Sequence, residues 1–182
     1  MSNKTKQLPK SLQILAWIIF IGVCGDAAGI VINTIYANFI DPKFSAKFWN
    51  HTDLAAVYNY NTLSFVGITT LMSIVNILKA VLFYFIVKMF QDKKLKVSDP
   101  FAEITKKYIT YFAFLSLSIA LFSKFAAELC KWLNNQKIDV PSIEDLKIGG
   151  ADVWFLLFFV LIVISKIFKR GIELQSENDL TV

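Results

Sequence analysis

The stretch ILAWIIFIGVCGDAAGIVINTIY, residues 14–36, decides the fold class of this chain. It is long enough to cross the hydrocarbon core of a bilayer, which is about 30 Å thick and needs about 20 mostly apolar residues in a helix. Backbone amides in lipid have no water to bind, so a segment of this kind has to be helical. A single carboxylate, Asp26, lies near the middle of the stretch. The sequence therefore predicts a membrane helix that carries a charge at a costly depth.

Three further apolar segments extend this prediction to the whole chain. The 182 residues are 55% hydrophobic with a mean hydropathy of +0.53, whereas soluble domains are roughly 45–50% apolar. We expect an all-α, four-helix transmembrane bundle that forms one integral-membrane domain, residues 1–182, and ends in a cytoplasmic tail, residues 171–182. The spans are placed at about residues 12–36, 63–89, 108–133 and 151–170.

The basic residues predict the orientation of the bundle. In a soluble protein a net charge of +5 would suggest a nucleic-acid partner. Here the lysines gather outside the spans, so the positive-inside rule accounts for them and we expect no direct contact with nucleic acid. They concentrate before the first span, between the second and third, and at the end of the fourth, which places both termini in the cytoplasm. These residues are Lys4, Lys6, Lys10, Lys88, Lys93, Lys94, Lys96, Lys106, Lys107, Lys166, Lys169 and Arg170.

Polar side chains recur at helical spacing in the first three spans. In the first, Gly22, Asp26, Gly29 and Asn33 share one face, and the second and third carry broader polar stripes. The fourth has no ionisable residue between Asp152 and Lys166, so it should contact the most lipid. Small residues beside polar groups let helices approach closely in lipid, and three stripes are therefore expected to converge. The predicted intramembrane polar cluster comprises Asp26, Asn33, Ser73, Asn76, Lys79, Ser123, Lys124 and Glu128.

The charges of this cluster suggest a pairing. At about 1.5 Å per residue, Asp26 and Lys124 lie at nearly the same depth, so we predict that they form a buried ion pair. Glu128 follows Lys124 by one helical turn and can share its ammonium group. With Lys79, these residues make two acids and two bases, and a neutral interior is what a low dielectric demands. Three roles stay open: structural pairing, a ligand-sensing or partner-gated site, and an ion or proton pathway.

Signatures of known chemistry are absent from the sequence. It contains no GxSxG, Walker or HExxH motif, so we assign no catalytic residue and expect no enzyme. His51 is the only histidine, and zinc usually needs three or four protein ligands, so no metal site and no cofactor are expected. Gly25 and Gly29 form a GxxxG motif, which serves a homo-oligomer as readily as an internal contact.

The C-terminal end carries a family resemblance. The ending Gly171-Ile172-Glu173-Leu174, followed by residues 177–182, ENDLTV, resembles the bacterial integral-membrane family catalogued as domain of unknown function 2975. The resemblance implies a four-span protein of the bacterial cytoplasmic (inner) membrane. Members of that family are often encoded beside a small helix-turn-helix transcription regulator, which implies such a regulator as a partner.

These observations lead to a functional hypothesis. We expect a non-enzymatic membrane protein, sensing or regulatory, that couples the polar intramembrane site to a cytoplasmic partner. The alternative is a small transporter or an ion- or proton-conducting membrane protein. Acidic and apolar side chains alternate in the tail and are expected to bind the partner: Glu173, Leu174, Glu177, Asp179, Leu180 and Val182.

Overall fold

The computed structural model describes residues 10–92 and 102–179. These residues form helices and loops without a β-strand, which confirms the all-α prediction. Four helices are long: α1 (Lys10–Phe39), α3 (Thr62–Gln91), α4 (Glu103–Asn135) and α5 (Ala151–Asp179). The connection between α1 and α3 holds three short elements, the 3₁₀ turns η1 (Pro42–Lys47) and η2 (Trp49–His51) and the helix α2 (Ala55–Tyr60). Each long helix is long and apolar enough to cross a membrane, as predicted.

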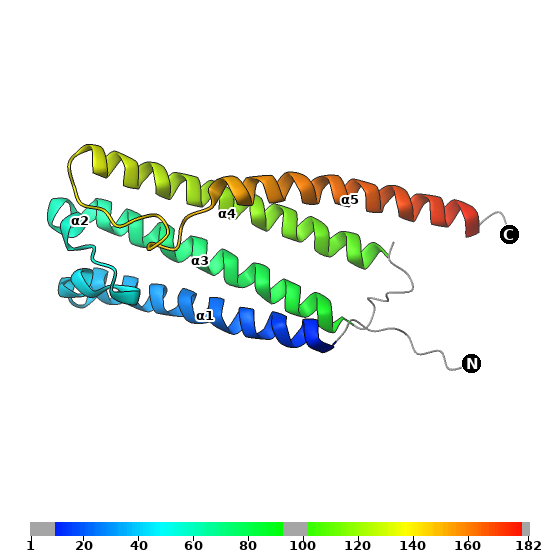
Figure 1. Ribbon diagram of the computed structural model, residues 1–182, viewed down its shortest axis with the longest axis horizontal. Coiled ribbons are helices and arrows are strands. Elements are labelled where there is room, and N and C mark those ends of the chain that lie inside the picture. Colours follow the sequence, from blue (N-terminus) through cyan, green and yellow to red (C-terminus); the bar gives the residue numbers. More distant parts are fainter. Residues whose placement is uncertain (1–9, 93–101, 180–182) are drawn as a thin grey trace.

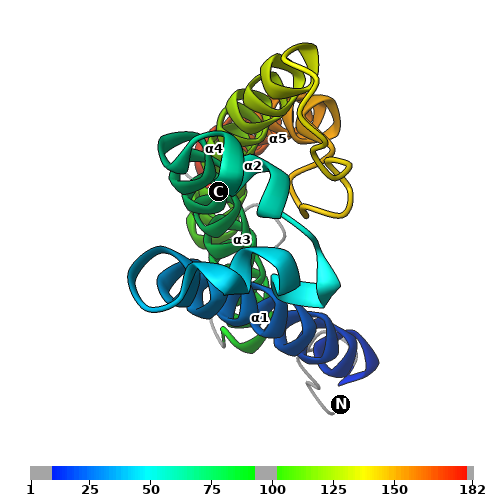
Figure 2. The ribbon, with the colours of Figure 1, turned by 90° about the vertical axis from the view of Figure 1, so that its left-hand side faces the viewer.

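The long helices pack in chain order. α1 lies against α3, α3 against α4, and α4 against α5 (Figure 1). Seen from the end, α1 and α4 lie on opposite sides of α3, and α5 lies beside α4 (Figure 2). We call the end that carries residues 40–61 and 136–150 the loop end. The opposite end, where α1 begins and α5 finishes, is the terminal end.

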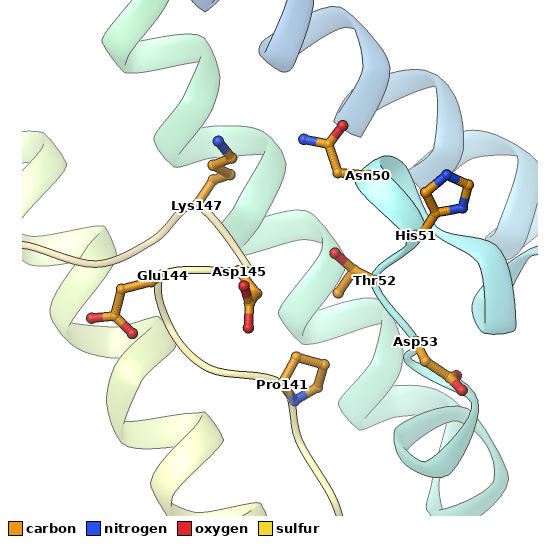
Figure 3. A pocket seen from close by; sticks show the side chains of 8 residues that line it. All are labelled: Asn50, His51, Thr52, Asp53, Pro141, Glu144, Asp145 and Lys147. Carbon is orange, nitrogen blue, oxygen red and sulfur yellow. The ribbon is translucent and has the colours of Figure 1, made fainter.

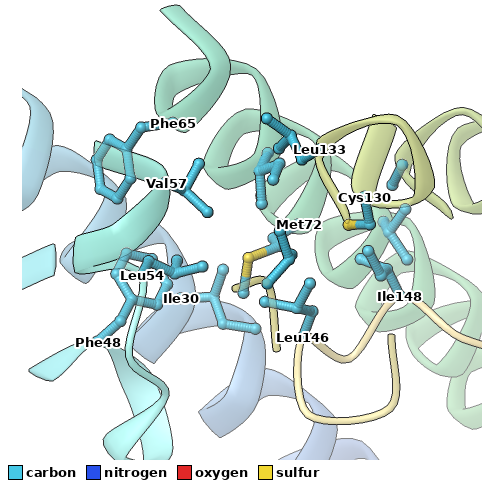
Figure 4. Packing of buried hydrophobic residues seen from close by; sticks show 14 of the residues in the cluster. Ile30, Phe48, Leu54, Val57, Phe65, Met72, Cys130, Leu133, Leu146 and Ile148 are labelled. Carbon is cyan, nitrogen blue, oxygen red and sulfur yellow. The ribbon is translucent and has the colours of Figure 1, made fainter. Parts of the chain in front are cut away.

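The best-packed core lies toward the loop end. Buried side chains of α1, α3 and α4 meet there with apolar side chains of both connections (Figure 4). Leu54 of the first connection and Leu146 of the 136–150 loop are fully buried, and Ile148 is 1% exposed. The loops are therefore part of the hydrophobic core, and their burial fixes their path over the helices.

The 136–150 loop runs back along the helices before α5 begins. Ala120 and Ala127 of α4 line the same groove as Ala151 of α5. At 1.5 Å per residue, α5 therefore starts roughly 12 to 22 Å short of the end of α4 at Asn135. Its other end extends past the neighbouring helices at the terminal end (Figure 1). None of its described side chains is buried, so α5 offers its apolar surface to the surroundings.

The helix of the fourth predicted span continues into the predicted tail. The sequence predicts a tail from residue 171, but α5 continues as a helix to Asp179. A single glycine, Gly171, costs a helix only about 1 kcal/mol, and no proline follows it. Glu173 also forms ion pairs with Lys169 at 3.9 Å and with Arg170 at 3.2 Å along the same helix. Leu180 and Val182, two of the predicted partner-binding residues, lie outside the described residues.

Candidate functional site

Asp26 and Gly29 of α1 hold the indole ring of Trp49. A Cβ atom at Gly29 would overlap the Trp49 ring, so only glycine leaves room for it. One turn away, Asp26 Oδ1 accepts a hydrogen bond from Trp49 Nε1 at 3.1 Å. The small residues of this face are predicted to admit another helix, but at Gly29 they admit a loop tryptophan. At Gly25 nothing lies within 4 Å of the position that a Cβ atom would take, so its use in a homo-oligomer stays a prediction.

Asp26 pairs with a lysine of the 136–150 loop. Its Oδ2 atom lies 3.7 Å from Lys147 Nζ, and the two side chains are 35% and 42% exposed. The prediction of an Asp26–Lys124 pair is therefore wrong. The depth count failed because it placed every connection beyond the ends of the spans, whereas this loop returns along the helices and delivers its own ammonium group to Asp26.

Lys147 also ties the loop to α3 through its backbone. Lys79 Nζ donates a hydrogen bond to the Lys147 carbonyl oxygen at 2.8 Å. Asn76 is buried, and its Nδ2 atom lies 3.5 Å from the same oxygen and 2.8 Å from the carbonyl of Met72. One loop residue therefore contacts α1 with its side chain and α3 with its carbonyl group.

Lys124 and Glu128 lie away from this network. They form an ion pair with each other at 2.9 Å, and their side chains are 67% and 54% exposed. The sharing of the Lys124 ammonium with Glu128 is confirmed, but their place in an interior cluster is wrong. Ser123, the third predicted residue of α4, is fully buried, and its hydroxyl has no hydrogen-bond partner among the described residues.

A polar seam joins α1 to α3 nearer the loop end. Ser73 is buried, and its hydroxyl lies 3.0 Å from that of Thr34. Asn38 Nδ2 donates to Thr69 Oγ1 at 3.2 Å. Asn33 is half-buried and donates to the carbonyl of Gly29 on its own helix at 2.8 Å. The seam contains Ser73 as predicted, but Asn33 bonds within α1 and contributes nothing to it.

A cavity of about 470 Å³ opens at the loop end between the two connections (Figure 3). Residues 50–53 line it from one side and residues 141–147 from the other. The chemistry of the lining is mostly acidic, with one ammonium and one imidazole group. The lining residues are Asn50, His51, Thr52, Asp53, Pro141, Glu144, Asp145 and Lys147.

Three residues of the cavity have left-handed backbone conformations. The φ angles are 56° at Asn50, 61° at His51 and 57° at Lys147. Such conformations are uncommon for residues other than glycine, and they persist only where the surrounding structure holds them. The packed core beneath both connections provides that support, so the lining is held in a defined shape. Among the described residues, no group of three or more His, Cys, Asp or Glu side chains is placed to hold a metal ion.

Sequence reasoning missed two residues that organise this region, Trp49 and Lys147. One signal for Lys147 was present, since it stands between Leu146 and Ile148 in a short alternation that indicates a segment with one buried side. Trp49 carried no comparable signal, because its partner is a glycine on a distant helix. Thr34 and Asn38 of the polar seam were also missed, although they follow Asp26 on α1.

The comparisons with known proteins give no match. No family model matches the chain, and neither a curated protein nor a solved structure matches it.

Proposed function

We propose that this is a non-enzymatic, multi-pass membrane protein that senses a small polar solute at the loop end and relays its binding to a cytoplasmic partner. The observation that carries the proposal is the double role of Lys147. It lines the cavity, and it also holds Asp26 of α1 and Lys79 of α3. The distribution of basic residues supports an orientation with the loop end outside and the terminal end in the cytoplasm.

The charges of the cavity favour a solute that carries an amino group. Asp53, Glu144 and Asp145 supply three carboxylates, and Lys147 supplies one ammonium group. An amine or a polyamine would complement the carboxylates, and the carboxylate of an amino acid would compete with Asp26 for Lys147. Competition of this kind changes the link between the loop and α1, which is how an occupied cavity would differ from an empty one.

The size of this coupling can be bounded. An ion pair with both side chains more than a third exposed is worth about 0.2–1 kcal/mol. Since about 1.4 kcal/mol corresponds to a factor of ten, release of the Asp26–Lys147 pair alone shifts an equilibrium by at most about fivefold. A response of this size suits a sensor whose output is a graded change in the affinity for a partner.

The core toward the terminal end supports a sensor over a transporter. Leu82 and Val87 of α3 are buried, as are Ala113 and Ile119 of α4. Among the described residues that lie beyond Asn76 toward the terminal end, the buried side chains are apolar apart from Ser116 and the hydroxyl of Tyr108. A conducting path would need a continuous line of polar groups, whereas the network of Asp26, Lys79 and Lys147 stays near the cavity.

The end of α5 is the proposed docking segment for the partner. Leu174 is 46% exposed, and Glu173 and Glu177 on the same helix add negative groups to this apolar surface. The family resemblance makes a small helix-turn-helix regulator the partner to test. Deletion of residues 173–182 should abolish its recovery with the membrane protein in a pull-down. Recovery that is unchanged after the deletion would remove the docking segment from the proposal.

The sensing role is tested with the full chain in lipid nanodiscs. Amines, amino acids and polyamines are screened for an increase in melting temperature, which binding to the folded state produces. The increase should disappear in Glu144→Gln and Lys147→Ala and persist in Lys137→Ala, an exposed lysine of the same loop that does not line the cavity. Flux of a hit compound into liposomes that is lost with Asp26→Asn would establish a transporter instead.

A further inference from the structure

A second cavity lies between α4 and the start of α5. It has a volume of about 510 Å³ and shares no lining residue with the cavity at the loop end. Leu121, Ile143 and Phe155 give it apolar walls, and Ala120 and Ala127 form part of its lining along α4. Two residues of opposite charge, Lys124 and Asp152, also line this groove.

The start of α5 places the groove at the edge of the membrane. From Val153 to Ser165 the helix carries no charged side chain, which is about 20 Å of helix. Just before it come Glu144 and Asp145, which are exposed. Because no described side chain of α5 is buried, lipid has to cover its apolar stretch, and water has to reach the charged loop. The hydrocarbon core therefore begins close to Asp152 on this side of the molecule.

The position of the membrane edge close to Asp152 explains the exposure of Lys124. A charged pair that faces acyl chains is costly, and such residues normally face the protein interior or a polar region. Lys124 and Glu128 are both more than half exposed. Since Lys124 lines the same groove as Asp152, the pair lies at the level of the lipid headgroups. Phosphate groups and water are available to it there.

We propose that this groove binds a membrane phospholipid whose headgroup carries both a phosphate and an amine, such as phosphatidylethanolamine. Lys124 binds the phosphate, since an ammonium group has three N–H donors and Glu128 occupies only part of them. Asp152 binds the amine of the headgroup. Phe155 lies in the groove and Phe159, one turn further along α5, is 52% exposed, so an acyl chain continues along an apolar surface.

The complement of charges distinguishes this lipid from others. A headgroup with phosphate alone would meet Lys124 but leave Asp152 facing a negative ligand. A zwitterionic headgroup satisfies both residues at once. The apolar walls of the groove also bury part of an acyl chain, and this burial favours binding in proportion to the apolar area removed from water. A soluble phosphate ester has no acyl chain and lacks this contribution. The site is therefore expected to prefer the whole amine-bearing lipid. None of the residues that line this groove lines the cavity at the loop end, so the lipid site can be tested separately from the sensing function.

The test uses the full chain purified in detergent and analysed by native mass spectrometry. Phosphatidylethanolamine, phosphatidylglycerol, glycerophosphoethanolamine and inorganic phosphate are added separately at equal concentration. We expect retention of phosphatidylethanolamine at least fivefold above that of phosphatidylglycerol, and no retention of the two soluble probes. Equal retention of both lipids, or retention of inorganic phosphate alone, would overturn the assignment.

Variants assign the effect to the groove. Lys124→Gln should reduce the retention of phosphatidylethanolamine at least fivefold, and Asp152→Asn should remove its advantage over phosphatidylglycerol. Lys131→Gln is the matched control, since Lys131 is an exposed lysine of α4 that does not line the groove. Both groove positions are exposed, and an unchanged melting temperature without lipid verifies that the variants fold. Retention by Lys124→Gln equal to that of Lys131→Gln would exclude the site.

Discussion

The ion pairs Asp26–Lys147 and Lys124–Glu128 differ in what they join. The first links α1 to a loop far along the chain, and the backbone of that loop is held in turn by Lys79 of α3. The second joins two residues one turn apart on α4. Only the first can report a change in the arrangement of the elements, because the second is satisfied within one helix whatever its neighbours do.

The comparison also shows how a polar residue is accommodated in an apolar helix. Asp26 is kept by contacts from two loops, the indole N–H of Trp49 and the ammonium of Lys147. Lys124 is kept by its position at the surface and by a neighbour on its own helix. A charge within an apolar run therefore does not by itself indicate an interior site. Whether such a charge lies in the interior depends on which other elements pack against it.

The largest effect is expected from a substitution of Gly29, which would break the contacts among Asp26, Gly29 and Trp49. Gly29→Leu places a side chain where the Trp49 ring lies, so the ring must leave together with its hydrogen bond to Asp26. Overpacking of this kind typically costs 1–3 kcal/mol, and we expect about 3 kcal/mol of unfolding free energy here. Gly25→Leu is the control, since nothing lies within 4 Å of that position. The free energy of unfolding of both variants is measured in mixed detergent micelles. Equal losses in the two variants would contradict the packing of the Trp49 ring on Gly29.

A smaller effect is expected from a substitution that removes the hydrogen bond between Trp49 and Asp26 but keeps the packing of an aromatic ring on Gly29. Trp49→Phe keeps an aromatic ring against Gly29 but removes the N–H that Asp26 accepts. A hydrogen bond to a charged group is worth about 1.5–3 kcal/mol, and with Asp26 partly exposed we expect about 1.5 kcal/mol. The loss should shrink when the same change is made in an Asp26→Ala background. A loss of the same size in both backgrounds would show that ring volume, and not the hydrogen bond, matters.

The next test compares the observed partner of Asp26 with the one predicted from depth. A double-mutant cycle of Asp26→Asn with Lys147→Met should give a coupling of about 0.5 kcal/mol, as expected for a partly exposed pair. The cycle of Asp26→Asn with Lys124→Met should give none. Both are read from the free energy of unfolding in micelles. Coupling in the second cycle and not in the first would restore the pairing predicted from depth.

The four helices could be predicted because length and apolar content alone decide whether a segment can span a bilayer. The inward side of α3 could be predicted too, since Ser73 and Asn76 repeat at helical spacing and both are buried. The contacts of Trp49 and Lys147 could not. They depend on the path of two connections over the helices, and that path is fixed by the burial of a few loop residues such as Leu54 and Leu146.

The error on α4 has a simpler cause. Consecutive residues on a helix are 100° apart, so Ser123 and Lys124 point in clearly different directions. The predicted polar residues of α4 belong to two faces, a buried one with Ser123 and an exposed one with Lys124 and Glu128. The sequence shows both faces as polar. Only the positions of α3 and α5 distinguish which one is covered.

The smallest expected effect concerns the second ion pair. Lys124→Met and Glu128→Gln each remove a contact between exposed side chains on one helix, and such contacts contribute little to stability. We expect no measurable change in melting temperature in lipid-free detergent for either variant, in contrast to Lys147→Met. A clear loss in both variants, cancelled in the double variant, would show that this pair also joins separate elements. The difference between the two ion pairs would then lie in strength and not in kind.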